Sequence, residues 1–281
     1  MDLKSRFIGT MTQEGILHEL TPRGISISKL VHSYANHQGS VYYGYFQQYE
    51  AGIKVKFYSE VSGSSENAPQ EYQNWKKMQH PNVKRLHECF WAWSGTAWYL
   101  VFVMEWCQWD GLQDINQRRM ERRSFTEPEL WGVLRGLTDA LATMQNQLFA
   151  HHNIKLENVY PSPTAPKIGD FSCAKHVNIR GFGSVSHSSA PSPFLSPELR
   201  QSTVNVFKAD AYSLGVVLLS LAKLEVPLCF QQTQVSDIDV ENSITGLFVS
   251  QHLKQVLRWM LMENIEARCD FKELHGWLQG A

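Results

Sequence analysis

The sequence has little that would fit a membrane span, a secretory leader or a nucleic-acid surface. Its most continuous apolar run, residues 214–224, contains serine and lysine and is shorter than the roughly 20 residues that cross a bilayer. The N-terminal segment 1–20 lacks the apolar core of a signal peptide. With 26 basic and 27 acidic side chains, the formal charge of -1 gives no general attraction to nucleic acid. We therefore expect a cytoplasmic protein with no membrane span and no nucleic-acid partner.

Cysteine is also sparse, and its spacing excludes two kinds of site. The five cysteines are far apart and form no CxxC pair, so neither a zinc site nor a disulfide framework is indicated. No G-x-x-x-x-G-K-[ST] string occurs, which argues against a P-loop nucleotide fold. Hydrophobic residues are plentiful. They make up 43% of the 281 residues, which is enough to form the core of one large domain or of a two-lobed unit.

The pattern of residues changes once along the chain. Residues 24–104 favour strands, because segments such as 41–46 and 98–104 are rich in aromatic and apolar residues. One stretch there, 68–79, has helical spacing and ends before Pro81. A small β-rich lobe with one helix is the expected beginning of the fold.

After residue 111 the pattern becomes helical. Thr126 and Glu129 have the spacing of a capping box, which opens a helix whose apolar stripe runs from Leu130 to Leu148. Helical patterns return at 208–224 and from residue 251 to the C-terminus. The proline- and serine-rich stretch between these helices, 150–202, predicts long functional loops.

Two short segments of the loop-rich stretch resemble sequence motifs of a known protein family. Residues 151–158 read HHNIKLEN and residues 169–172 read GDFS, and they resemble the H-R-D-L-x-x-x-N and D-F-G motifs of eukaryotic protein kinases. Further along, 196–198 resembles A-P-E, and Arg268 stands where the family has an arginine that pairs with the glutamate of that motif. Upstream, the segment 51–54 resembles V-A-I-K. The chain is thus similar to a Ser/Thr-type kinase domain over nearly its whole length.

The resemblance implies an α+β class and a bilobal protein-kinase-like fold, with a larger and mainly helical C-lobe. We expect an N-terminal extension at 1–21, an N-lobe at 22–104 and a C-lobe at 105–281, which together make one kinase domain over 22–281. A non-kinase fold with chance motifs is the remaining alternative. Four residues resemble the stacked regulatory spine of the family and are equally well read as core: Trp75, Leu86, His151 and Phe171.

The resemblance also implies a nucleotide site in the N-lobe. Lys54 would pair with Glu71 and meet phosphate oxygens of ATP. Lys56 has the same strand parity as Lys54 and is the second choice, and an exposed strand lysine is the alternative for either. Five further positions resemble the loop, gatekeeper and hinge that surround ATP: Gly39, Val41, Met104, Glu105 and Cys107.

In the C-lobe, Asn158 and Asp170 match the two family positions that bind Mg²⁺, since both offer the oxygen ligands that this cation prefers. A turn-forming Asp and a loop-satisfying Asn are the alternatives. Lys155 matches the lysine that approaches the transferred phosphate. Asn153 stands at the position of the catalytic aspartate, and its amide has negligible basicity, so no proton acceptor remains there.

Other departures accompany this one. Tyr34 and Asn36 stand at the first two positions of the glycine-rich loop, although a strand-end aromatic is an equal reading for Tyr34. His152 replaces the arginine that pairs with a phosphorylated loop, and Ser172 replaces the glycine of D-F-G. Pro191 stands where these kinases have a supporting threonine. A neighbouring serine cluster is either a phosphorylation target of another enzyme or solvated linker: Ser184, Ser186, Ser188 and Ser189.

These observations predict a pseudokinase that acts as a scaffold or allosteric partner of other proteins in signalling. ATP and Mg²⁺ are the implied ligands, with weak or absent occupancy left open. The alternative is a slow or unconventional Ser/Thr protein kinase that transfers the γ-phosphate of ATP to a protein hydroxyl, because orientation and charge neutralisation provide most of phosphoryl transfer. The identity of the protein partners cannot be read from the sequence.

Overall fold

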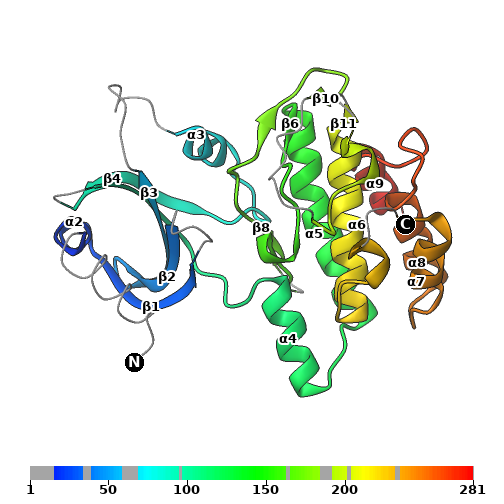
Figure 1. The fold of residues 1–281 in the computed structure, drawn as a ribbon, viewed down its shortest axis with the longest axis horizontal. Coiled ribbons are helices and arrows are strands. Elements are labelled where there is room, and N and C mark those ends of the chain that lie inside the picture. Colours follow the sequence, from blue (N-terminus) through cyan, green and yellow to red (C-terminus); the bar gives the residue numbers. More distant parts are fainter. Residues whose placement is uncertain are drawn as a thin grey trace. The chain divides into compact units, whose positions relative to one another are not determined.

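The computed structural model describes residues 16–33, 39–58, 69–94, 97–162, 165–183, 192–200, 204–231 and 235–280. The chain divides into two compact units, which are Met1–Lys76 with Lys84–Gln108 and Lys77–Val83 with Trp109–Ala281. The elements of the first unit are blue and cyan in Figure 1, and the helices of the second run from green to red. The lobe limits of 22–104 and 105–281 stay predictions.

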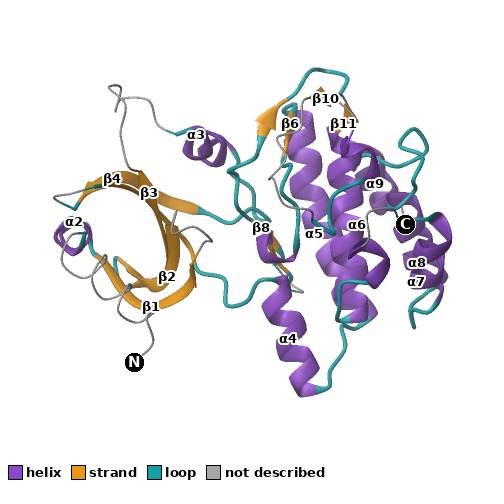
Figure 2. Cartoon of the chain, viewed as in Figure 1, coloured by secondary structure: helices purple, strands orange, loops and turns teal. Residues whose placement is uncertain are grey.

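The first unit is built on a five-stranded antiparallel sheet with the strand order β1-β2-β3-β5-β4. Figure 2 shows these strands as one curved layer. The helix expected at 68–79 is present as α3, and a one-turn helix, α2, precedes the sheet. The described elements are α2 (Leu17–Leu20), η1 (Thr21–Arg23), β1 (Ile25–Ser33), β2 (Gly39–Phe46), β3 (Tyr49–Tyr58), α3 (Gln70–Lys77), β4 (Leu86–Trp93) and β5 (Trp98–Glu105).

The two faces of the sheet bury different residues, because successive side chains of a strand point to opposite sides. On one face, Ile53 and Val55 of β3 pack in a cluster with Leu20 of α2. On the other face, Trp75 of α3 stacks on Phe102 of β5 with ring centroids 6.1 Å apart. Because side chains alternate along β3, Lys54 and Lys56 point to the side of the sheet that α3 covers.

The second unit is mainly helical, with three two-stranded pairs, β6-β9, β7-β8 and β10-β11. Its helices are α4 (Gly111–Glu121), α5 (Glu127–Asn146), α6 (Val206–Lys223), α7 (Asp237–Thr245), α8 (Gln251–Met260) and α9 (Phe271–Gly280). The short elements are β6 (Phe149–Ala150), η3 (Leu156–Asn158), β7 (Val159–Tyr160), β8 (Lys167–Ile168), β9 (Lys175–His176), β10 (Phe182–Gly183), η4 (Pro197–Arg200), β11 (Val204–Asn205) and η5 (Leu228–Gln231).

Helix α5 follows the sequence closely. Thr126 and Glu129 form the capping box, in which the Glu129 amide donates to the Thr126 hydroxyl and the Glu129 carboxylate accepts from the Thr126 amide. The apolar stripe from Leu130 onward is buried, and it packs against α6 and α9. The helix ends at Asn146, so Leu148, with φ of 56°, lies two residues beyond it and the predicted stripe is too long.

Two helical predictions differ from the structure. The pattern from residue 251 to the C-terminus is two helices, α8 and α9, separated by a turn in which Arg268 is buried. Helix α4 was not foreseen, because its mostly polar residues give no wide apolar stripe. Across the described ranges, no helix combines the length and apolar character that a membrane span requires.

Candidate functional site

The first unit contains a buried charge cluster on β3 and α3. Lys54 Nζ donates to Glu71 Oε1 at 2.6 Å, and only 4% of Lys54 and 6% of Glu71 are exposed. Lys56 Nζ donates to the second oxygen, Oε2, at 2.8 Å. Both lysines reach one carboxylate because they are two residues apart on a strand and so lie on the same face. The Lys54 ammonium also lies 5.7 Å from the centre of the Phe102 ring.

The register of the sheet decides which residues are neighbours of Lys54. Val41 of β2 is its direct partner, and Gly39 is opposite Lys56. On the other side, Gly52 pairs with the buried Met104. A Cβ at Gly52 would stand 3.1 Å from the Met104 methyl carbon, so a glycine lets these two strands keep their side chains close.

The end of β5 is anchored to the residue that precedes β4. The Glu105 amide donates to the Arg85 carbonyl at 2.8 Å, and the Arg85 amide donates to the Glu105 side chain, at Oε2, at 3.1 Å. Trp106 packs on Tyr43 with ring centroids 4.8 Å apart. Cys107 is half-buried. These contacts fix the direction in which the chain leaves the sheet.

In the second unit, the segment 151–158 is held by a buried aspartate of α6. Asp210 Oδ2 accepts from the His151 amide at 2.7 Å, and Oδ1 accepts from the His152 amide at 3.0 Å. Burial raises the pKa of Asp210 to about 7, and these two backbone donors act against that rise. His152 needs the anchor, because its φ of 62° is one that residues with a side chain adopt rarely.

His151 is held in its neutral form. Its Nε2 lies 3.1 Å from the Gly169 carbonyl and its Nδ1 accepts from the Asn153 amide at 3.3 Å, so the neutral tautomer with a proton on Nε2 fits both contacts. Burial lowers the pKa of His151 to about 4. The ring also packs edge-on against Phe171, with centroids 5.2 Å apart. This pair is the part of the predicted spine that lies in the second unit.

Asn153 uses its amide as a donor to the residue that follows Gly169. Its Nδ2 donates to Asp170 Oδ2 at 2.9 Å. Asp170 has φ of 64°, a left-handed conformation that Asp tolerates better than most residues. Asn158 completes the group, because its Nδ2 donates to the Asn153 carbonyl at 2.7 Å. Asn153 is thus the common partner of the two side chains predicted to bind metal.

The remaining residues of the loop divide into one that is available and one that is enclosed. Lys155 keeps 34% of its side chain exposed and lies 3.9 Å from Glu157, a separation too long for a strong pair. His152 is largely enclosed, and burial lowers the pKa of its imidazole to about 4. Its buried Nε2 has no hydrogen-bond partner among the described residues. A neutral ring cannot replace the cationic fork of an arginine.

The segment 196–198 is tied to the turn before α9 by a buried ion pair. Arg268 Nη1 donates to Glu198 Oε1 at 2.6 Å, and Nη2 donates to Oε2 at 3.0 Å. The guanidinium also lies over the Tyr212 ring at 4.8 Å. Two parallel hydrogen bonds hold both side chains in one geometry. This is the pair that the sequence predicted for Arg268.

The order and contacts of these residues agree with one domain family. A family model described as "Protein kinase domain" matches residues 37–277. The chain belongs to this family. The match confirms the predicted resemblance to eukaryotic protein kinases. It also confirms the predicted fold class, which is the α+β, bilobal class of kinase domains.

Curated relatives of this kinase domain carry protein-kinase names, and several of these names specify serine/threonine. CBL-interacting protein kinase 4 of Oryza sativa subsp. japonica is 29% identical over 81% of this chain and 51% of its own length. Serine/threonine-protein kinase Nek5 of Mus musculus is 31% identical over 54% of this chain and 23% of its own. Serine/threonine-protein kinase PLK4 of Drosophila grimshawi is 28% identical over 76% of this chain and 28% of its own length. The chain therefore spans about half or less of the length of these relatives.

The residues of this kinase domain have the chemistry to hold a hard cation. Asp170 offers a carboxylate, and Asn158 offers its amide oxygen because its nitrogen is used by the Asn153 carbonyl. No group of three His, Cys, Asp or Glu that could hold a metal occurs within the described ranges. Mg²⁺ commonly takes one or two protein oxygens and completes its shell with water and substrate phosphates, so two ligands fit it.

Several predicted positions of the kinase domain lie outside the described residues. They are Tyr34, Asn36, Pro191 and the serines at 184, 186, 188 and 189. Ser172 is described, and its Oγ donates to Cys173 Sγ at 3.9 Å. Two features were missed by the sequence reading. The first is that Glu71 pairs with two lysines, and its only signal in the sequence is that Lys54 and Lys56 are two residues apart on a strand. The second is that Asp210 anchors the His151 amide, and its only signal is an acidic residue within an apolar helix.

Proposed function

We propose that this kinase domain is a pseudokinase, whose phosphoryl transfer is impaired and which acts as a scaffold or allosteric partner of other proteins. The observation that carries the proposal is the 2.9 Å hydrogen bond from Asn153 Nδ2 to Asp170 Oδ2. In an active kinase, the side chain at the Asn153 position accepts the proton of the substrate hydroxyl. Here it presents a donor, and the bond directs that donor to a carboxylate.

The chemistry of an amide gives the size of the effect. An amide oxygen takes up no proton near neutral pH, so a hydroxyl attacking phosphate has no acceptor at this position. Loss of a general base commonly slows a reaction by about 10² to 10⁴. Lys155 cannot replace the base, because its ammonium only donates. The only carboxylate within residues 151–158, Glu157, lies 3.9 Å from the Lys155 ammonium and keeps 46% of its side chain exposed.

Nucleotide binding is the second part of the proposal. Lys54, held by Glu71, would contact phosphate, and Asn158 with Asp170 would hold Mg²⁺. Gly39, Val41 and Met104 would border the nucleoside together with the segment from Glu105 to Cys107. When bound, ATP supplies the phosphoryl group and Mg²⁺ neutralises its developing charge. Asn153 would have to share or release Asp170 Oδ2 for the cation, so we expect Mg²⁺ to add little to nucleotide affinity.

Binding of a fluorescent ATP analogue, with and without Mg²⁺, tests this part. Lys54→Ala removes a charge-assisted contact worth about 1.5–3 kcal/mol, so we expect about a tenfold to hundredfold weaker affinity. Lys56→Ala is the matched control, because Lys56 pairs with the same Glu71 carboxylate from the next position on that face. Equal loss in both variants would contradict the assigned phosphate contact. No binding to the wild type at millimolar nucleotide would remove ATP from the proposal and leave the scaffold role.

A slow Ser/Thr protein kinase is the second candidate, and two observations favour it. The Lys54–Glu71 ion pair is formed, and Lys155 is retained and partly exposed. Orientation and charge neutralisation provide most of phosphoryl transfer, so these groups could support a slow reaction. Activity of the wild type that Lys54→Ala abolishes would support this candidate. Activity that appears only in Asn153→Asp would exclude it and support the pseudokinase.

A further inference from the structure

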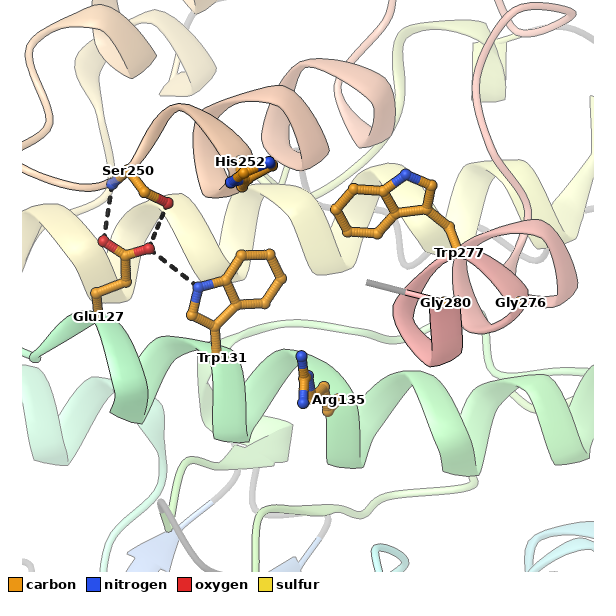
Figure 3. A pocket seen from close by; sticks show the side chains of 8 residues that line it. All are labelled: Glu127, Trp131, Arg135, Ser250, His252, Gly276, Trp277 and Gly280. Carbon is orange, nitrogen blue, oxygen red and sulfur yellow. Dashed lines mark hydrogen bonds between the residues drawn. The ribbon is translucent and has the colours of Figure 1, made fainter.

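The second unit has a cavity between α5, α8 and α9 that the kinase motifs do not include. Its volume is about 640 Å³. Figure 3 shows the indole of Trp131 on α5 and that of Trp277 on α9 directed to this cavity, with His252 and Arg135 at its edges. The two rings are nearly parallel, at 20°, with centroids 6.4 Å apart. We call this space, with its two indoles, the tryptophan cavity.

The acidic residue of the tryptophan cavity is already used inside the protein. Glu127 accepts hydrogen bonds from the Ser250 amide at 2.7 Å, from the Ser250 hydroxyl, and from Trp131 Nε1 at 3.0 Å. The Ser250 hydroxyl is the main cause that lowers the pKa of Glu127, so the carboxylate stays ionised. These bonds satisfy the polar edge of Trp131 and fix its ring. The ring face is left for apolar contact.

The cation at the edge of the cavity is not compensated in this way. Arg135 is exposed and forms no ion pair with any residue in the described ranges. Its guanidinium is 5.8 Å from the centre of the Trp131 ring, close enough to present a charge beside the aromatic wall. His252 adds an exposed imidazole on the opposite side. The Glu127 oxygens accept the hydrogen bonds from Ser250 and Trp131, so Arg135 is the charged side chain of this lining that can pair with an added group, and the group it pairs with is anionic.

Two glycines of α9 keep the cavity open. Gly276 and Gly280 are one helical turn apart and both line it. A Cβ at either position would meet nothing within 4 Å, so no contact of the described residues requires a glycine there. Glycine within a helix is unfavourable relative to alanine. The missing side chains therefore leave room for a group that is not part of the described chain.

The hollow continues beyond Arg135. A second cavity of about 330 Å³ shares this residue and is lined by Gly136 and Asp139 of α5 and by His275 and Leu278 of α9, among others. Its acid, Asp139, forms a hydrogen bond with His275, with Oδ1 3.1 Å from Nε2. The two hollows form a groove along α5 and α9 with Arg135 at the middle. A groove of this kind fits an extended peptide better than a compact small molecule.

We propose that the groove along α5 and α9 is a docking site for an acidic peptide segment of a partner protein. An aromatic side chain of the peptide packs on Trp131 and Trp277, and a neighbouring Asp or Glu pairs with Arg135. Aromatic anchors and charge-assisted pairs with arginine are the contacts that contribute most at such sites. The proposal goes beyond the pseudokinase function, because the groove is independent of nucleotide and of Asn153.

A random heptapeptide library displayed on phage, panned on the full chain and counter-selected on Arg135→Glu, tests the site. We expect enrichment of peptides that carry Asp or Glu within two residues of Trp, Tyr or Phe. The best peptide, synthesised with a fluorophore, should bind Arg135→Glu at least about tenfold more weakly by fluorescence anisotropy, because the ion pair becomes a repulsion. Lys272→Glu, an equal charge change on α9 outside the groove, should leave its affinity unchanged.

A second variant separates groove filling from loss of fold. Gly276→Gln places a long side chain in the opening and should weaken binding at least about tenfold, while its melting temperature stays level or rises. Gly276→Ala adds only a methyl group in open space and should retain binding. Failure to enrich acidic-aromatic peptides, or equal binding by Arg135→Glu, would overturn the proposal. Self-association of the wild type that Arg135→Glu abolishes would assign the groove to a second copy and overturn it as well.

Discussion

Glu71 in the first unit and Asp170 in the second stand at motif positions of one family. Glu71 accepts hydrogen bonds from charged lysines, whereas the Asn153 side chain that donates to Asp170 is neutral. Glu71 accepts from two lysines, Lys54 at 2.6 Å and Lys56 at 2.8 Å. Asp170 accepts from the amide of Asn153 at 2.9 Å. The cationic group expected to meet phosphate is kept in a defined place. The group expected to take a proton has become a donor.

The difference shows which part of the site has changed. The backbone of segment 151–158 is still anchored, because Asp210 holds the His151 and His152 amides. Only the side chain of Asn153 turns that frame from proton acceptance to donation. A single substitution can therefore test the comparison without rebuilding the loop.

Removing the doubly paired carboxylate should have the largest effect. Glu71→Gln removes the charge that Lys54 Nζ meets at 2.6 Å inside the protein, and breaking such a buried pair costs about 3 kcal/mol or more of the free energy of unfolding. Lys56→Gln is the control, since 28% of the Lys56 side chain is exposed and its loss should cost less than about 1 kcal/mol. Urea unfolding measures both. A Glu71→Gln cost no larger than that of the control would break the comparison.

Restoring a carboxylate at the base position should have the next largest effect. Asn153→Asp replaces the 2.9 Å hydrogen bond by two like charges, and we expect a loss of about 1–2 kcal/mol at neutral pH. Millimolar Mg²⁺ should recover part of this loss if the two oxygens share the cation. Thermal unfolding in chelator and in Mg²⁺ measures the change. The double variant with Asp170→Asn should regain stability in chelator, and an unchanged melting temperature in the single variant would contradict the contact.

The pH dependence of stability sharpens the account of the anchored frame. The pKa of His151 is about 4 in the folded protein, below its ordinary value of 6.5, so the unfolded chain binds a proton first as the pH falls. This contribution is complete above pH 6.5 and is lost between 6.5 and about 4, at up to about 1.4 kcal/mol per pH unit. Urea unfolding of the wild type and His151→Gln across this window measures the term.

Asp210 acts in the opposite direction over part of that window. Its pKa is raised from 3.8 to about 7, so the folded protein gains a proton first and is stabilised as the pH falls through 7 toward 4. The wild type and His151→Gln both contain Asp210. The difference between their slopes of stability against pH therefore gives the contribution of His151 alone. Parallel slopes for the wild type and His151→Gln would refute the neutral His151.

The smallest expected effect concerns Lys155. Its side chain is 34% exposed and lies 3.9 Å from Glu157, so Lys155→Met should change the free energy of unfolding by less than about 0.5 kcal/mol. Thermal unfolding checks this value. A larger loss would show that Lys155 supports the loop and is not available for phosphate.

The sequence predicted the elements in which local signals and burial agree. The Thr126–Glu129 capping box and the following apolar stripe specify α5 without help from the rest of the chain. The motif segments 151–158 and 169–172, with Lys54 and Glu71, gave the fold because their order and separation are specific. Helix α4 has its own capping box, Asp110 with Gln113, but its polar surface gave no periodic signal beyond that spacing.

The sequence by itself determined that a carboxylate is missing at Asn153 and that Lys54, Glu71, Asn158 and Asp170 remain. Only the tertiary structure decided what Asn153 does in place of a base, because the direction of an amide depends on which residue faces it across the fold. It also decided that Glu71 serves two lysines, since strand register and helix position bring them together. The groove at Arg135 likewise arises from the packing of α5 against α9, which are more than a hundred residues apart in the chain and give no joint signal in the sequence.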